Sequence, residues 1–454
     1  MSNDIVVINV SETVSPAPST LQQTGALITQ GGTTTAAQTL TLCSALADVT
    51  AILAPGKALT SLAWSTGVVT ATTTAPHGWT NGDVITATIS GASPAGYNGT
   101  FPITISGAST FTYALVSDPG SETVPGTVTL GAVDELTQMA TTYFAQTGAK
   151  PVYVLELGEG TAAEGVTDLT TFITANPSTI YSYLVPREWD AESTFHTFIG
   201  NYASTTSKTY FFVTTTSLTY SNYTAKKSVL CLVESPNKPA TEFSLAAVFA
   251  VTLRYAPSSS NKVPPLAFSF VYGVTAYPLT GNATLLNTFK AANVNYIDTA
   301  AEGGLSNTVV KWGHVMDGKP FNYWYSVDWA QINIHIALAN EVINGSNSTL
   351  APLYYDQNGI NRLQNRARQT IASAVTYGLA TGSVVLTQLS ATQFATNFEN
   401  GDYAGQLAIN AEPFAVYTQE NPSDYAAGTY GGLAATYTPS RGFESIVFNL
   451  NVVF

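Results

Sequence analysis

The sequence is poor in charge. Charged residues make up only 10% of its 454 residues, whereas about 25% is typical of globular proteins. A soluble monomer usually carries more charge on its surface. The shortage indicates that much of the surface is covered, most simply by further copies of the same chain. Hydrophobic residues make up 45%, which excludes a disordered chain, because disorder requires low hydrophobicity and high charge.

Basic residues and long apolar runs are also scarce. The net charge of −13 argues against nucleic-acid binding, which normally requires a basic face. No run of about 18 consecutive apolar residues is present, so no membrane-spanning segment is expected. The start, Met1-Ser2-Asn3-Asp4, lacks the basic residues of a secretory signal. We therefore expect a protein made in the cytoplasm, with no membrane insertion and no direct contact with nucleic acid.

Residues suited to metal binding and catalysis are few. Cys43 and Cys231 lie far apart in the sequence, and we interpret both as buried small apolar residues rather than as a disulfide or a metal pair. No Gly-x-Ser-x-Gly motif is present, although a catalytic triad or carboxylate pair assembled from distant residues stays open. No metal-ligand spacing occurs among His77, His196, His314 and His335. We predict no enzyme activity, no metal and no cofactor.

One glycine-rich segment has the spacing of a phosphate-binding loop. Gly160 and Gly165 are five residues apart, as in that motif, but Val166 stands where the phosphate-binding lysine is required. Glu159 and Glu164 would also repel a phosphate. The segment therefore does not predict nucleotide binding.

Residues 61 to 130 differ from the rest of the chain, because charge nearly vanishes there and Thr, Ser and Gly dominate. The dipeptides Asn81-Gly82 and Asn98-Gly99 supply the chemistry of tight turns. A small all-β domain inserted into a larger domain is predicted. Three stretches alternate with the period of two that is typical of strands, and their apolar positions are Ile85, Ala87, Ile89, Phe101, Ile103, Ile105, Phe111, Tyr113 and Leu115.

Around this insertion, strands alternate with helices, which favours a sheet covered by helices. We expect a first core part at residues 21–60 and 131–282 and a C-terminal α/β domain at residues 283–440. Within the second, residues 321–325 are predicted to form a strand, and Asp328 is predicted to cap a long helix. The expected fold class is α+β, a mixed α/β core with an inserted small all-β domain and extended terminal β arms at residues 1–20 and 441–454.

The two chain ends carry the most distinctive pattern. Residues 5 to 10 are β-prone and precede a Pro-rich tether at residues 15–19, while residues 446 to 454 alternate between two faces, one of them wholly apolar. An unpaired apolar strand invites aggregation, so both ends need partners. The side chains that we expect in such pairing are Ile5, Val6, Val7, Ile8, Val10, Ile446, Phe448, Leu450, Val452 and Phe454.

Magnitudes leave two interpretations of these ends open. Burying the five large apolar side chains of the last strand contributes at most roughly 8–15 kcal/mol, and ordering its backbone costs roughly 9–18 kcal/mol. For one strand alone, the free energy gained by burial and the cost of ordering the backbone nearly cancel. Main-chain hydrogen bonds and a second added strand make the pairing favourable. Both ends can complete a sheet of their own subunit, or they can exchange between subunits by adding a strand to a neighbour's sheet.

The layout resembles that of contractile bacteriophage tail sheath proteins. The resemblance covers most of the chain outside the β insertion, and the stretch from Lys311-Trp312-Gly313 to Asn340-Glu341 is similar to one phage branch of that family. Its elements are the N-terminal arm, the segment from Tyr143 to Gly148 leading into Val152-Tyr153-Val154, the long helix opened by Val327-Asp328-Trp329, and the C-terminal strand.

This resemblance implies a structural subunit that forms stacked hexameric rings around a tail tube and contracts to drive the tube through the host envelope. The implied partners are further copies of the chain, the tail tube protein, the baseplate and the tail terminator. The implied location is the virion tail, after assembly in the host cytoplasm. A candidate tube contact is the basic cluster on a predicted helix, Arg362, Arg366 and Arg368, although a solvated helix face is the plainer interpretation.

The alternatives are another virion protein, such as a baseplate or fibre component with a carbohydrate-binding β module, and a secreted glycosidase. Gene neighbourhood and particle shape would separate them from a sheath, because only a sheath is expected next to a tail-tube gene and as hollow cylinders.

Overall fold

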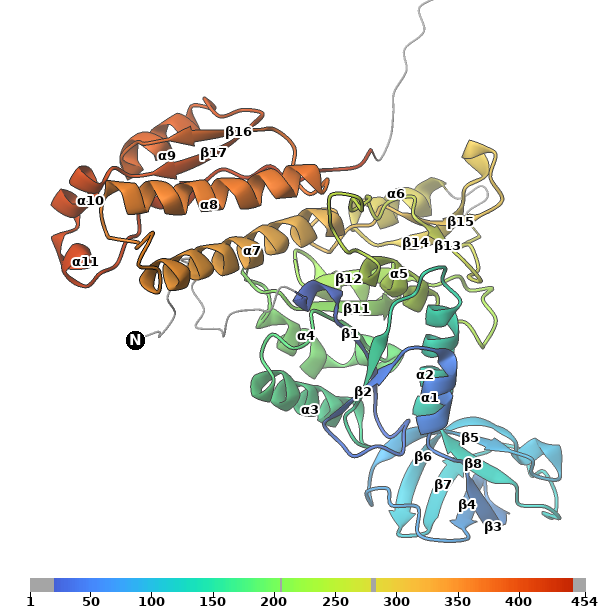
Figure 1. The fold of residues 1–454 in the computed structure, drawn as a ribbon. Coiled ribbons are helices and arrows are strands. Elements are labelled where there is room, and N and C mark those ends of the chain that lie inside the picture. Colours follow the sequence, from blue (N-terminus) through green and yellow to red (C-terminus); the bar gives the residue numbers. More distant parts are fainter. Residues whose placement is uncertain (1–19, 205, 279–282, 444–454) are drawn as a thin grey trace, which may run out of the picture. The chain divides into compact units, whose positions relative to one another are not determined.

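The computed structural model describes residues 20–204, 206–278 and 283–443 (Figure 1). The chain divides into two compact units. The core unit comprises Thr24–Arg254 and Phe268–Gly318, and the C-terminal unit comprises the described residues 20–23, Tyr255–Ala267 and 319–443. Both predicted terminal strands lie outside the described residues. The expected fold class, mixed helices and sheets with a small inserted β domain, is confirmed.

A six-stranded sheet organises the core unit, in the order β12-β11-β10-β1-β9-β2. Five strands run parallel, and β2 pairs antiparallel with β9 at one edge. Parallel sheets are covered on both faces, which explains why the central strands β1, β10 and β11 are buried along their whole length. The bounds are β1 (Gly25–Thr29), β2 (Thr39–Cys43), β9 (Val152–Glu156), β10 (Ser182–Leu184), β11 (Tyr210–Thr215) and β12 (Val229–Val233).

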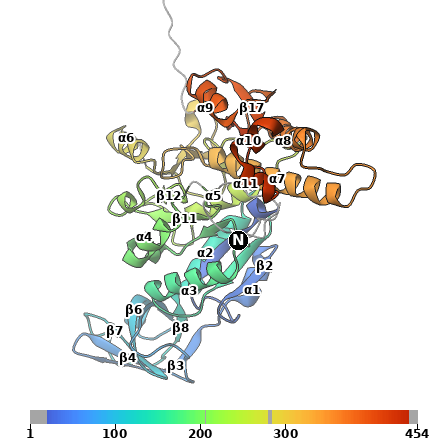
Figure 2. The same cartoon turned by 90° about the vertical axis from the view of Figure 1, so that its left-hand side faces the viewer.

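Helices lie on both faces of this sheet (Figures 1 and 2). On one face, α3 (Ala162–Ala175) and α4 (Ser193–Gly200) pack on a core of aromatic and aliphatic side chains. On the other, α2 (Gly131–Phe144) packs against α5 (Ser244–Leu253). A smaller sheet of β13 (Phe270–Val271), β15 (Thr308–Lys311) and β14 (Tyr296–Thr299), together with α6 (Ala283–Ala291), completes the unit; α1 (Leu46–Ile52) follows β2.

The inserted domain is a closed barrel of six strands in the order β3-β4-β7-β6-β5-β8. The period-two stretches predicted from the sequence form β5, β6 and β7, and their alternate residues fill the barrel. The closed barrel leaves no free sheet edge of its own. The bounds are β3 (Lys57–Ser65), β4 (Val68–Thr73), β5 (Val84–Ser90), β6 (Gly99–Gly107), β7 (Thr110–Ala114) and β8 (Thr127–Leu130).

The C-terminal unit is built on two long helices, α7 (Phe321–Ser346) and α8 (Gln357–Thr376), which pack against each other. They support a three-stranded sheet in the order β16-β17-β18. Its elements are β16 (Ser383–Thr387), α9 (Ala391–Glu399), β17 (Gln406–Ala411), α10 (Phe414–Glu420), α11 (Pro422–Ala426) and β18 (Leu433–Ala435).

The start of α7 corrects one prediction. Residues 321–325 are helical rather than a strand, and Asp328 lies inside the helix rather than at its cap. Pro320 precedes the first turn with extended backbone angles, and proline is well placed at a helix start. Phe321, Trp324 and Tyr325 are buried together, because residues three and four apart share a helix face.

Candidate functional site

The C-terminal unit offers open sheet edges where added strands can pair. Among the described residues, β17 pairs with both of its neighbours, while β16 and β18 each pair only with β17. Leu386 on β16 is 41% exposed, and β18 is largely exposed along its short length. An edge strand with unpaired backbone groups is a template for another chain.

Side chains of α8 and of the neighbouring strand β17 hold the end of β16 in place. Gln364 of α8 is buried, and its Nε2 donates to the carbonyls of Thr387 and Ile409 at 2.7 and 2.8 Å. The Asn410 side chain accepts from the Leu389 amide at 2.9 Å and donates to the Leu389 carbonyl at 2.9 Å. The edge strand is thus fixed at its C-terminal end before any partner arrives.

The three predicted tube-contact arginines lie on α8 but differ in their surroundings. Arg362 faces the rest of its own unit: its guanidinium contacts the Glu341 carboxylate at 2.6 Å and donates to the carbonyls of Ala351 and Pro352 at 3.1 and 2.9 Å. Arg366 is half-buried and donates to Gln369 at 3.1 Å. Arg368 is exposed. Of the three, Arg368 is the one best placed for an external contact.

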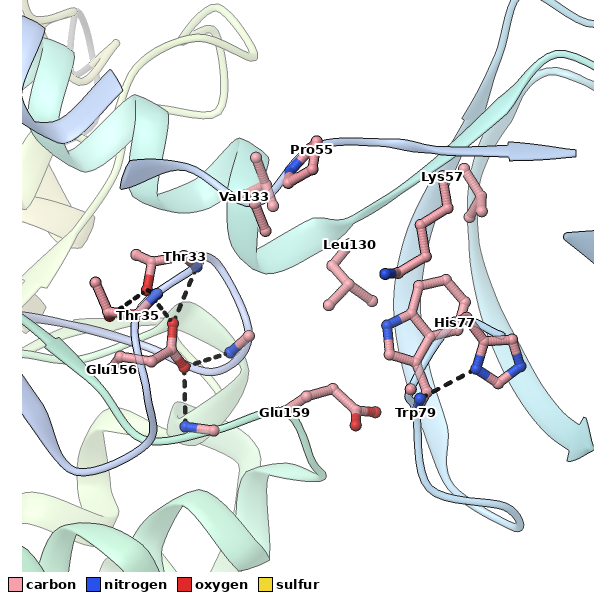
Figure 3. A pocket seen from close by; sticks show the side chains of 15 residues that line it. Thr33, Thr35, Pro55, Lys57, His77, Trp79, Leu130, Val133, Glu156 and Glu159 are labelled. Carbon is pink, nitrogen blue, oxygen red and sulfur yellow. Dashed lines mark hydrogen bonds between the residues drawn. The ribbon is translucent and has the colours of Figure 1, made fainter. Parts of the chain in front are cut away.

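A second site lies where the barrel meets the core (Figure 3). A cavity of about 230 Å³ separates the β1–β2 connection of the core from the barrel wall. Figure 3 shows Glu159 extending from the core side toward Trp79, while the ammonium group of Lys57 points into the cavity from the barrel. A further cavity of about 300 Å³ lies beside the first turn of α2, and Glu159 lines both cavities.

On the core side, a buried carboxylate organises the loops around the cavity. Glu156 is 1% exposed. Its oxygens accept from the amides of Gly31 at 2.7 Å, Thr33 at 2.9 Å and Gly158 at 2.8 Å, and from the Thr33 hydroxyl at 2.8 Å. A buried polar group is stable only when its hydrogen bonds are made, so this residue serves as a structural anchor.

The neighbouring acidic residues are less well satisfied. Oε1 of Glu159 and Oδ2 of Asp83 are buried, and neither accepts a hydrogen bond within the described part of the chain. Burial, and then the charge of Asp83, raise the pKa of Glu159 to about 7. Burial also raises the pKa of Asp83. In contrast, the amide and hydroxyl of Thr161 bond to Glu164 at 2.7 and 2.8 Å and hold its pKa below the usual range.

This geometry explains the glycine-rich segment that mimics a phosphate loop. Thr161 and Glu164 form a capping box at the start of α3, a signature that is readable from sequence. Gly165 is required for packing, because a Cβ there would lie 2.3 Å from the Gln30 side chain. The segment starts a helix and packs it on β1.

Histidines and cysteines have structural surroundings. The His77 ring stacks on Trp79 with centroids 4.6 Å apart, and burial lowers the pKa of His77. Cys43 and Cys231 are both buried, and neither forms a disulfide. Within the described residues, no group of three or more His, Cys, Asp or Glu side chains is arranged to hold a metal ion. No helix of the described chain is long and apolar enough to cross a membrane.

Comparison with known proteins gives matches in structure alone. No protein-family model matches the chain, and no curated protein matches it either. The fold aligns with the sheath tail protein of Listeria innocua at a TM-score of 0.41 and 12% identity, over 79% of this chain and 85% of that chain. It aligns with the contracted helical sheath of the anti-feeding prophage at a TM-score of 0.49 and 11% identity, over 99% of both chains. Both are described as sheath proteins, the class that the sequence resembles.

Proposed function

We propose that this chain is the structural subunit of a contractile phage tail sheath, which polymerises through its own two ends. One observation carries the proposal. The sequence predicts an apolar β-strand at each end of the chain, and the sheet β16-β17-β18 has an open edge on both sides within the described residues. Strands that need partners and edges that can receive them thus occur in one molecule.

Strand addition fits the chemistry of these edges. Main-chain hydrogen bonds supply affinity in such pairing, and alternate side chains supply specificity. Ile446, Phe448 and Leu450 would share one face of the predicted last strand and would extend the apolar face of the receiving sheet. Because Gln364 and Asn410 already hold the end of β16, little ordering of the receiving strand opposes the addition.

The mechanism is mechanical. Six subunits form a ring around the tail tube, and strands exchanged between subunits join the rings into a sleeve. The extended sleeve is metastable, and its subunits rotate as rigid bodies into a packing with more contact. The energy is stored at assembly, so no nucleotide or cofactor is required. The partners are further copies of the chain, the tube protein, the baseplate and the tail terminator, and the assembly, formed in the host cytoplasm, belongs to the virion tail.

Arg368, the exposed residue of the basic cluster, is the one that contacts the tube. Arg362 is bound to Glu341 and serves its own unit. Arg368 is exposed on α8, and a single arginine can bind a carboxylate of a partner protein through two hydrogen bonds. Exchange of Arg368 for alanine is therefore expected to weaken tube binding without unfolding the subunit.

Electron microscopy of the purified chain tests the proposal. Hollow cylinders of uniform width are expected. Compact oligomers of one size would contradict it and favour a baseplate or fibre component, and measurable glycan cleavage would favour a glycosidase.

Removal of residues 446–454 tests the role of the chain end within the same assay. The truncated chain is expected to stay folded, because the deletion leaves every described residue of both compact units in place, and to form no long cylinders. Deletion variants with cylinders of normal length would exclude strand exchange through this end.

A further inference from the structure

The barrel is joined to the core by two short connections. One leads from α1 through Pro55 and Gly56 into β3, and the other passes from β8 straight into α2 at Gly131. Both glycines lie against the barrel, since a Cβ on Gly56 would be 2.8 Å from the Thr129 hydroxyl and a Cβ on Gly131 would be 3.0 Å from the Thr86 side chain. The two connections therefore lie side by side, and any tilt of the barrel must turn about this pair, which we call the hinge.

One side of this hinge is firmly closed. Val133, in the first turn of α2, is buried within the apolar core of the barrel. The Thr88 hydroxyl of the barrel donates to Asp134 of α2 at 2.9 Å. These contacts form a pivot at the first turn of α2, around which the rest of the barrel base can move.

The other side of the hinge is lined by the two cavities. Glu159 extends across it between the two cavities, toward the barrel loop that holds Trp79 and Asp83 (Figure 3). The Thr80 backbone amide lies against its carboxyl group. The bond from Thr80 favours the ionised carboxyl group, but burial and the charge of Asp83 oppose ionisation more strongly, so the neutral form is favoured while the gap is closed.

The charges around Glu159 are mostly negative. Asp83 faces it from the barrel, and Glu164 faces it from α3 with a charge that is held by Thr161. Lys57 of β3 is a cation whose charge acts on Glu159, and His77 lines the same cavity. The remaining charged or titratable groups of the two cavities are Glu156, whose hydrogen bonds are satisfied, and Asp134, Glu135, Arg187 and Glu188 on the far side.

We propose that the barrel is hinged on the core at its two connections, and that ionisation of Glu159 opposite Asp83 opens the hinge as the pH rises from acidic to neutral. At acidic pH Glu159 is neutral and bridges the gap to the barrel loop. At neutral pH its charge is repelled by Asp83 and Glu164, and the state in which water reaches it is favoured. The barrel then gains freedom to tilt about the pivot at Val133.

Linkage sets the size and direction of the effect. The pKa of Glu159 is about 7 in the closed state, and it returns to the ordinary value of a glutamate when the open state lets water reach it. Glu159 therefore binds its proton more tightly in the closed state. The ratio of open to closed barrels therefore rises with pH, by at most about tenfold per pH unit, between about pH 4.5 and pH 7. Above that range the ratio levels off.

Spin-label distances on the full chain test this hinge. Spin labels are attached to Thr104→Cys on β6 and Thr171→Cys on α3, which are both exposed. The label reacts with these two positions only, because both native cysteines are buried. Double electron–electron resonance from pH 5 to pH 8 is expected to show a second, longer distance whose population grows up to pH 7. One unchanged distance distribution over this range would overturn the proposal.

Three variants assign the response to Glu159. Glu159→Gln is expected to keep the short distance at every pH, and Asp83→Asn is expected to move the transition to lower pH because it removes the repelling charge. Glu399→Gln, an exposed site on α9, is the matched control and should leave the transition unchanged. A transition that persists unaltered in both Glu159→Gln and Asp83→Asn would contradict the assignment.

Discussion

The guanidinium of Arg362 contacts the Glu341 carboxylate at 2.6 Å and so ties α8 to α7. The same side chain donates to the carbonyls of Ala351 and Pro352 in the turn between the two helices. One residue therefore holds two helices and the turn that joins them. It would leave a partly buried carboxylate and two carbonyls without a donor if it were removed.

We predict that Arg362→Ala lowers the free energy of unfolding by roughly 1–3 kcal/mol, because these acceptors lose their hydrogen bonds. Denaturant titration of the C-terminal unit's transition measures the loss. Arg368→Ala on the same helix is the matched control, and its exposed side chain predicts a change within about 0.5 kcal/mol. Equal effects of the two substitutions would contradict the structural role of Arg362.

Gly165→Ala is predicted to destabilise the core unit. Its new Cβ would lie 2.3 Å from the Gln30 side chain, which cannot move aside, because it donates to the Thr161 carbonyl at 2.8 Å and accepts from the Trp189 indole at 2.8 Å. Overpacking of this kind typically costs about 1–3 kcal/mol.

Thermal unfolding of Gly165→Ala is compared with that of Thr167→Ala, an exposed site on the same helix. The comparison separates the effect of the clash from the effect of helix propensity. The first variant should melt at a lower temperature, and the second close to the wild type. A wild-type melting temperature for Gly165→Ala would show that α3 does not pack on Gln30 as described.

Stability is predicted to fall as pH rises toward neutrality. Burial raises the pKa of Glu135 to about 7 even though Arg187 lies beside it. Between the unfolded pKa and pH 7 the folded state binds more protons than the unfolded state, so the free energy of unfolding decreases with pH.

Denaturant titrations from pH 5 to pH 7.5 check this sign for Glu135. Glu135→Gln is expected to make the free energy of unfolding depend less steeply on pH. Glu159, whose pKa is also raised, accounts for a further share of this pH dependence. A pH dependence unaffected by Glu135→Gln would show that Glu135 is ionised in the fold, and His77→Gln serves to separate the opposite contribution of His77, whose pKa burial lowers.

A charge on the open edge of β16 is predicted to block assembly while leaving the fold intact. Leu386→Lys places a cation at a position that is 41% exposed, and charged side chains on edge strands oppose added strands. Thr396→Lys on the exposed side of α9 introduces the same charge away from the edge. Cylinders from the control and none from Leu386→Lys are expected in electron micrographs. Normal cylinders from Leu386→Lys would exclude this edge.

Much of the fold is readable from local patterns. The barrel strands follow from alternation with tight turns, as in Ile103 and Ile105 of β6. The start of α3 was not predicted, although Thr161 and Glu164 form a capping box there. The start of α7 was predicted wrongly, because Phe321, Tyr323 and Tyr325 favour strands by propensity. Burial of Phe321, Trp324 and Tyr325 on one helix face outweighs that preference.

The sites are harder to read, since they depend on residues far apart in the chain. Glu341 precedes Arg362 by 21 residues, and no spacing rule links residues on two different helices. Glu159 and Asp83 meet only because the barrel is inserted between β2 and α2. Sequence alone therefore placed the arginines on a helix but could not distinguish the structural Arg362 from the exposed Arg368.

A density map of assembled particles at side-chain detail tests the central claim most directly. We predict that residues 5–10 and 446–454 of one subunit run alongside β16 or β18 of another, with main-chain hydrogen bonds between the two copies. Both ends folded back into the sheet of their own subunit, with no strand shared between copies, would contradict it.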